Sequence, residues 1–192
     1  MFSAPSFLAY VLVCTFTPGP NNLMSMGNAG RVGLKKSLPF CLGVMVGFLL
    51  VMALCLLAGE LLYAVLPSVK PYLLVLGAAY ILYLAWKIYK SDGVHGAEKS
   101  STGFFTAVLL QFVNPKGVIY GLTAASVYIL PFYRDPGTLA FFAAFMALVC
   151  LISTVAWAGF GSAFKRLFVT HARAVNTVMA LLLVYCAVSL FF

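Results

Sequence analysis

The residues best suited to bind a small polar molecule lie in two short motifs, each of which places asparagine beside proline inside an apolar stretch. The motifs are CTFTPGPNN at residues 14–22 and FVNPKG at residues 112–117. Proline lacks a backbone N–H and clashes with the carbonyl four residues earlier, so each motif is expected to break a helix. A broken helix exposes carbonyls that can accept from an ammonium group. The first N–H groups of the helix that follows carry partial positive charge and can donate to a carboxylate.

The first motif offers backbone and side-chain groups together. Pro18 frees the carbonyl of Cys14, and Pro20 frees the carbonyl of Phe16. Glycine between the prolines permits backbone angles that other residues resist. A simple proline kink is the alternative, with the threonines and asparagines bonding neighbouring helices. Taken with the second motif, the segment predicts binding residues at Pro18, Gly19, Pro20, Asn21 and Asn22.

The second motif adds a positive charge at the depth of a membrane interior. Lys116 lies 12 residues beyond Phe104, where an apolar run begins. A lysine at the centre of a membrane helix costs about 2.5–3.5 kcal/mol, so we expect it to face a cavity and to attract an anionic group such as a carboxylate. If the span began at Lys116 instead, the apolar run before it would have no place. The predicted binding residues of this motif are Gln111, Asn114, Pro115 and Lys116.

The composition indicates the class of protein and the kind of elements in which these motifs lie. The chain has 192 residues, of which 64% are hydrophobic and 8% charged, with a mean hydropathy of +1.06. A soluble domain carries roughly 25% charged residues, so this is an integral membrane protein. Backbone groups in lipid must bond within their own segment, which makes the spans helices and the fold all-α. Six transmembrane helices are expected, at about Ser6–Gly27, Pro39–Leu62, Tyr72–Ile88, Phe104–Leu130, Leu139–Gly161 and Ala174–Phe192.

The basic residues predict an orientation rather than a nucleic-acid surface. The net charge is +8, but the basic side chains are scattered through connections between apolar runs. Lys70 and Arg134 fall on one side and nine others on the opposite side, which by the positive-inside rule is cytoplasmic. Both termini would then be periplasmic. The nine are Arg31, Lys35, Lys36, Lys87, Lys90, Lys99, Lys165, Arg166 and Arg173.

The spacing of the two motifs predicts an internal repeat. Pro18 and Pro115 are 97 residues apart, close to half the chain, and each interrupts the first span of a three-span half. Halves of three spans enter the membrane from opposite sides, which is the geometry of an inverted repeat whose broken helices 1 and 4 meet near the midplane. The predicted single transporter domain, 1–192, comprises repeat one (about 1–90), a cytoplasmic linker (about 91–102) and repeat two (about 103–192).

The chain offers little for other kinds of chemistry. Its five cysteines occur singly, and neither a paired set of metal ligands nor a catalytic set of side chains is evident, so we expect no metal, no cofactor and no enzyme activity. No acid falls at the midplane of a span. If transport is coupled to protons, the proton would be carried by Glu60, by Lys116 or by the substrate. The four acidic residues are Glu60, Asp92, Glu98 and Asp135.

Several segments resemble one known family. TPGPNN, the basic segment GRVGLKK, GVMVGF and the asparagine-proline-lysine break are similar to the LysE/RhtB amino-acid exporters. GAAYILYLAWKIYKS, LQFVNPKGVIYGLTA and LLLVYCAV look most like the branch that exports cysteine and O-acetylserine. The resemblance implies proton-driven export of a small neutral amino acid through the bacterial inner membrane. Export of homoserine, threonine or a basic amino acid, and a passive channel, stay open as alternatives, and so does a homodimer.

Overall fold

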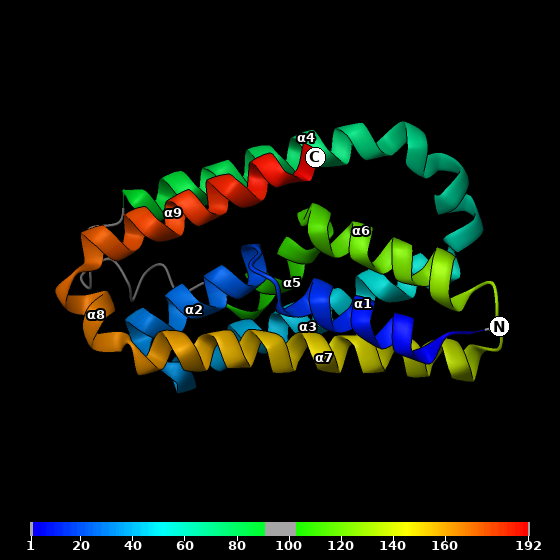
Figure 1. The fold of residues 1–192 in the computed structure, drawn as a ribbon, viewed down its shortest axis with the longest axis horizontal. Helices are drawn as coiled ribbons and strands as arrows, with labels where there is room; N and C mark the ends of the chain where they lie inside the picture. Colours follow the sequence, from blue (N-terminus) through cyan, green and yellow to red (C-terminus); the bar gives the residue numbers. More distant parts are fainter. Residues whose placement is uncertain (1, 91–102, 192) are drawn as a thin grey trace.

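Helices make up the regular structure of the described residues. The computed structural model describes residues 2–90 and 103–191. Their helices run largely along one axis, with α4 and α9 side by side on one edge, α7 on the opposite edge, and the short helices between them (Figure 1). The elements are α1 (Ala4–Phe16), α2 (Pro20–Val32), α3 (Leu34–Leu57), α4 (Gly59–Tyr89), α5 (Phe104–Val113), α6 (Pro115–Thr123), the π-helix η2 (Ala124–Ile129), α7 (Pro136–Ala163), α8 (Lys165–Thr170), α9 (Ala172–Val188) and the 3₁₀ turn η3 (Ser189–Phe191).

Both proline motifs interrupt helices, as the sequence predicts. Thr17 ends α1 in an extended conformation, and α2 begins at Pro20 with Gly19 as its N-cap. In the second motif α5 ends at Val113 and α6 begins at Pro115, with extended Asn114 between them. Pro18, Pro20 and Pro115 cannot donate a backbone bond to the preceding turn, so a helix ends and a new one begins within each motif.

Three helical segments are long and apolar enough to cross a membrane. They are Leu34–Leu57, Pro136–Ala163 and Ala172–Phe191, with 24, 28 and 20 residues. At 1.5 Å per residue, the shortest of them spans about 30 Å, the thickness of a hydrocarbon core. Shorter apolar helices occur at Ala4–Phe16, Leu74–Tyr89 and Phe104–Val113. An all-helical membrane protein follows, whereas the count of six spans stays a prediction.

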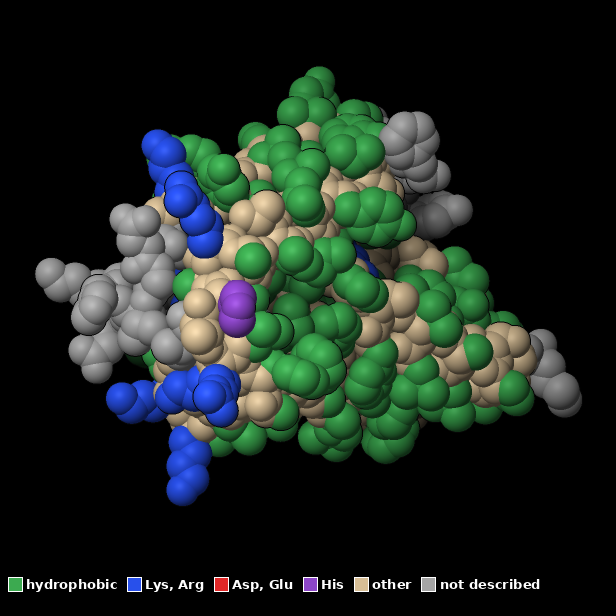
Figure 2. Space-filling view, turned by 60° about the vertical axis from the view of Figure 1, so that its left-hand side comes forward, with side chains coloured by type: hydrophobic (Ala, Val, Ile, Leu, Met, Phe, Trp, Pro, Cys, Tyr) green, Lys and Arg blue, Asp and Glu red, His purple; other side chains and the backbone are tan. Residues whose placement is uncertain are grey.

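Most of the basic residues that the structure describes gather at one end of the molecule, which we call the basic end. Figure 2 turns this end forward and shows lysine and arginine side chains along it, while most of the visible side surface is apolar. The termini of α2, α3, α4, α8 and α9 that carry the predicted basic residues meet there (Figure 1). Lys99, with the rest of the predicted linker, lies outside the described residues. The N-terminus lies at the opposite end, which we call the N-terminal end.

One connection is shorter than the sequence suggested. A loop was expected between the first two spans, but α2 and α3 are joined by Gly33 alone. Its φ of 90° lies in the left-handed region, which glycine adopts without a steric penalty. Arg31 therefore lies in the last turn of α2, and Lys35 and Lys36 lie in the first turn of α3.

Glycines hold the helices together in the basic half of the molecule. A Cβ at Gly47 of α3 would lie 2.6 Å from the carbonyl oxygen of Val108 in α5, and one at Gly43 would clash with the same helix. In α7, a Cβ at Gly161 would clash with the backbone of Met26 in α2. The two seams, α3 with α5 and α7 with α2, let helix backbones touch in the way that small residues allow in membranes.

Candidate functional site

The two interrupted helices meet through Lys116. Its Nζ donates to the Thr17 carbonyl oxygen at 3.1 Å, to Thr17 Oγ1 at 3.0 Å and to the Pro18 carbonyl oxygen at 3.2 Å. Gly19 makes the approach possible, because a Cβ there would lie 2.9 Å from that Nζ. The cation of the second motif is therefore held by backbone oxygens of the first motif, across 98 and 99 residues of chain.

A cavity of about 40 Å³, the central cavity, lies between the motifs. A water molecule needs roughly 10–15 Å³ measured in this way, so the space holds only a few water-sized molecules. Six of the nine predicted binding residues line it, whereas Pro18, Gln111 and Pro115 lie beside it. The lining residues are Cys14, Thr15, Gly19, Pro20, Asn21, Asn22, Phe48, Asn114, Lys116, Gly117, Tyr120 and Cys150.

Asn21 and Gln111 form a reciprocal amide pair between α2 and α5. Asn21 Nδ2 donates to Gln111 Oε1 at 2.8 Å, and Gln111 Nε2 donates back to Asn21 Oδ1 at 3.1 Å. Gln111 is 1% exposed and also donates to the Ala107 carbonyl. This pair ties the two motifs together on the side of the cavity toward the basic end, where α2 and α5 extend.

Asn22 stabilises the extended segment between α1 and α2. Its Nδ2 donates to the carbonyl oxygens of Thr15 at 2.8 Å and Thr17 at 3.0 Å. Ser153 of α7 donates to the same Thr15 oxygen at 3.0 Å. The buried amide thus gives hydrogen-bond donors to two carbonyls at the end of α1, and it holds the extended segment in place.

The carbonyls that the sequence assigned to an ammonium group already accept hydrogen bonds. The carbonyl oxygen of Cys14 accepts from Thr17 Oγ1 at 3.2 Å, and that of Phe16 accepts from Trp157 Nε1 at 3.2 Å. The carbonyl oxygen of Gln111, four residues before Pro115 and freed by that proline, accepts from the Asn114 N–H at 3.4 Å. In this conformation the protein supplies donors for these oxygens itself, because backbone acceptors in an apolar interior are costly to leave unpaired.

The two restarting helices differ at their first turns. Asn114 caps α6, since its side-chain oxygen accepts from the Gly117 N–H at 3.5 Å. No side chain caps α2, which begins with Gly19 and Pro20 at the cavity wall. The first N–H groups of α2, beginning at Asn21, therefore remain suited to an anionic ligand beside Lys116.

Four lining residues outside residues 14–22 were not among the predicted binding residues. Phe48 and Tyr120 stack with ring centroids 5.3 Å apart, and Thr15 Oγ1 donates to the Tyr120 hydroxyl at 3.1 Å. Cys150 is buried in α7. Only Tyr120 could have been inferred, because it lies four residues after Lys116 and so shares its helix face. The remaining residue of the four is Gly117.

Comparison with known proteins decides the family. The model of the LysE type translocator matches residues 12–192. This chain belongs to that family. Cysteine/O-acetylserine efflux proteins are among its relatives. The one from Klebsiella pneumoniae is 39% identical over 187 residues, which cover 95% of this chain and 94% of the relative. Those from Salmonella typhimurium and Escherichia coli K12 are 38% identical over 188 residues, covering 97% of this chain and 96% of each relative. No solved structure matches the chain.

Membership in the LysE family makes the chain a membrane translocator and not an enzyme. Family membership does not by itself assign a role to any residue of the central cavity.

Proposed function

We propose that this chain exports small neutral amino acids of the cysteine and O-acetylserine kind across the bacterial inner membrane. The observation that carries the proposal is Lys116, an intramembrane cation that lines a cavity together with the uncapped start of α2. The names of relatives that share 38–39% of their residues with this chain over nearly its full length support the substrate class.

The central cavity suits the two charged groups of an amino acid. Lys116 and the first N–H groups of α2 take the carboxylate, and the amide oxygens of Asn21, Asn22 and Asn114 take the ammonium. Phe48 and Tyr120 accommodate a small side chain. The cavity of about 40 Å³ is too small for this ligand as it stands. Binding therefore replaces the Thr17 and Pro18 oxygens on Lys116 by the substrate carboxylate and separates the two motifs.

Charge favours a neutral amino acid over a basic one. Lys116 is the only basic residue among those found to line the central cavity, and no acidic residue is among them. The second cation of lysine or arginine would meet Lys116 at close range in a medium of low dielectric constant. Homoserine and threonine are not disfavoured in this way and remain the alternative substrates.

The proposed architecture is six spans in two inverted repeats, 1–90 and 103–192, joined by the cytoplasmic linker 91–102. Support comes from the paired breaks, from α3 and α7 as the second helices of each half, and from α4 and α9 lying side by side. The positive-inside rule makes the basic end cytoplasmic and the N-terminal end periplasmic. Because α9 runs away from the basic end, the C-terminus is assigned to the periplasmic side as well.

The conformation is proposed to be closed toward the cytoplasm. The glycine seams of α3 with α5 and of α7 with α2 lie in the basic half of the molecule, as does the Asn21–Gln111 pair. Rocking of one repeat against the other would open these seams and admit substrate. The proton-motive force is the proposed driving force. Its carrier is Glu60, Lys116 or the substrate, and the Glu60 side chain lies outside those described.

Replacement of Lys116 tests the proposed site. We expect Lys116→Met to lower efflux of cysteine and O-acetylserine at least about 10-fold at matched protein level, because a hydrogen bond to a charged group contributes about 1.5–3 kcal/mol. Efflux is measured as the amino acid appearing outside cells that overexpress the chain. The matched control is the same exchange at exposed Lys36, which should leave efflux unchanged. Equal efflux by Lys116→Met and the unaltered chain would remove Lys116 from the site.

A further inference from the structure

A second and larger cavity lies at the N-terminal end. Its volume is about 760 Å³, and it lies between the last turns of α3 and the first turns of α7. Ligand-binding cavities in proteins typically measure about 300–1,000 Å³. Buried Leu56 and Ala143 line it. Exposed Arg134, in the connection between η2 and α7, lines it too, and we call this exposed side its mouth. Arg134 has so far entered only the positive-inside rule, and the proposed binding site does not include this cavity.

The two cavities lie one above the other along the same pair of helices. Phe48 of α3 lines the central cavity and Leu56 lines the larger one, eight residues later, or about 12 Å along the helix. In α7, Cys150 and Ala143 line the same two cavities, seven residues or about 10 Å apart. Residues three, four, seven and eight apart share a helix face, so one continuous face of each helix leads from one cavity to the other.

Between the two cavities lie four residues, three of which have sulfur-containing side chains, and we call these four the sulfur layer. Met52 and Met146 lie midway along those two faces, and each is 0% exposed. Cys55 and Gly121 complete the layer, since a Cβ on Gly121 would lie 3.4 Å from Cys55 Sγ and 3.5 Å from Met52 Sδ. Methionine has three rotatable bonds and repacks at low cost, so such a layer can close and open.

The helix that carries Gly121 is irregular directly after this layer. α6 passes into the π-helix Ala124–Ile129, and Ser126 Oγ donates to the Leu122 carbonyl at 2.7 Å. A π-helical stretch changes the register between the backbone and its side chains and occurs frequently at functional sites. Here it joins the part of α6 at the central cavity to the segment that leads to Arg134.

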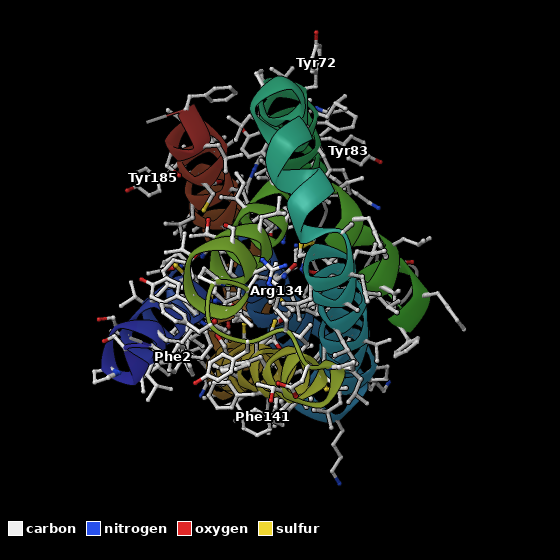
Figure 3. The ribbon with its side chains drawn as sticks, turned by 90° about the vertical axis from the view of Figure 1, so that its right-hand side faces the viewer. Phe2, Tyr72, Tyr83, Arg134, Phe141 and Tyr185 are labelled. Atoms are coloured by element: carbon white, nitrogen blue, oxygen red, sulfur yellow. The ribbon has the colours of Figure 1, made fainter. Side chains whose placement is uncertain are left out.

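Arg134 brings a positive charge to the mouth of the larger cavity. Figure 3 looks along the bundle from the N-terminal end and shows Arg134 near the middle of the surrounding helices. The next residue, Asp135, caps α7, since its side chain accepts from the Thr138 N–H at 2.8 Å. That backbone bond lowers the pKa of the Asp135 carboxyl, so Asp135 stays ionised as the helix cap at neutral pH.

We infer that the larger cavity is the exit vestibule for the exported amino acid, in which Arg134 receives the substrate carboxylate after the substrate has passed the layer formed by Met52, Met146, Cys55 and Gly121. The ligand is a small amino acid bound through its carboxylate. The inference rests on the proposed function. The substrate carboxylate then binds two basic side chains in turn, first Lys116 in the central cavity and then Arg134 at the exit.

The first test measures competition from outside. Right-side-out membrane vesicles are loaded with radiolabelled O-acetylserine, and unlabelled O-acetylserine is added outside to occupy the vestibule and slow efflux. For Arg134→Gln we expect the external concentration that halves efflux to rise about 10-fold, because a charge-assisted hydrogen bond is lost, and for Arg134→Lys to rise much less. Lys165→Gln, at the basic end, is the matched control and should behave like the unaltered chain.

The outcomes separate this inference from the proposed function. Absence of efflux from vesicles carrying the unaltered chain would contradict the proposed function. Efflux that external O-acetylserine does not slow, or that it slows equally in Arg134→Gln, would overturn the vestibule and leave the proposed function standing.

The second test addresses the path through the sulfur layer. Gly121→Leu should block efflux while O-acetylserine still raises the melting temperature of the purified protein, because the central cavity remains. Gly121→Ala is the matched control, since its Cβ makes ordinary contacts, and it should transport normally. Efflux by Gly121→Leu at the unaltered rate overturns the path.

If Gly121→Leu does not fold, Met146→Ala tests the path instead. It should let O-acetylserine leak down its gradient without a driving force, and a leak equal to that of the unaltered chain overturns the path.

Discussion

At the scale of single residues, the polar groups of the site satisfy one another's hydrogen bonds. Lys116 bonds to Thr17 and Pro18, Asn21 bonds to Gln111, and Asn22 bonds to backbone of the first break. Each group would be costly to bury alone, because an unpaired donor or acceptor in an apolar interior loses its hydrogen bonds to water. A ligand that competes for these groups must therefore supply hydrogen bonds in place of those that it displaces.

The Asn21–Gln111 pair gives a prediction for stability. Asn21→Leu and Gln111→Leu should each destabilise the protein, because each leaves the other amide unpaired, by about 1–2 kcal/mol. The double variant should be destabilised by less than the sum of the two single variants, since it leaves no amide behind. Unfolding by denaturant in detergent measures all four proteins. Strict additivity would show that the two side chains do not interact in the membrane protein.

At the scale of elements, the proposed closure of the basic end depends on the two glycine seams. α7 offers a direct comparison within one helix. Gly161 faces the backbone of α2, whereas a Cβ on Gly159 would have nothing within 4 Å. Both exchanges to alanine improve helix propensity by about 1 kcal/mol, so any difference between them comes from the contact with α2.

We expect Gly161→Ala to weaken the closed basic end and Gly159→Ala to leave it intact. Gly161→Ala should lower the melting temperature and let O-acetylserine leak from loaded vesicles without a driving force. Gly159→Ala should export normally and melt at the same temperature or higher. Equal leak rates in the two variants would contradict the assignment of α2 and α7 as the closing seam.

At the scale of the whole molecule, the breaks were predictable and their surroundings were not. Proline and an intramembrane lysine have effects that depend on local backbone chemistry, so Pro18, Pro115 and Lys116 could be singled out from sequence. Phe48 and Cys150 could not, because an apolar residue at a cavity wall looks like any other residue of a membrane core. The single-residue connection at Gly33 was missed for a similar reason, as basic residues were read as loop when they extend two helices.

The freed carbonyls show a second limit of local reasoning. The sequence correctly indicated that prolines release the carbonyls of Cys14 and Phe16. It could not indicate that Thr17 and Trp157 would occupy them, because Trp157 is 141 residues away from Phe16. The larger cavity likewise has no motif, since it arises from the spacing of α3 and α7 at the N-terminal end.

The central claim is export of small neutral amino acids, and an amino-acid panel tests it most directly. Cells that overexpress the chain are compared with cells carrying an empty vector, and the compounds that accumulate outside are quantified. Cysteine and O-acetylserine should be enriched several-fold, whereas lysine and arginine should not, because a second cation is repelled by Lys116. Failure to enrich any small neutral amino acid, or enrichment of lysine or arginine instead, would contradict the account.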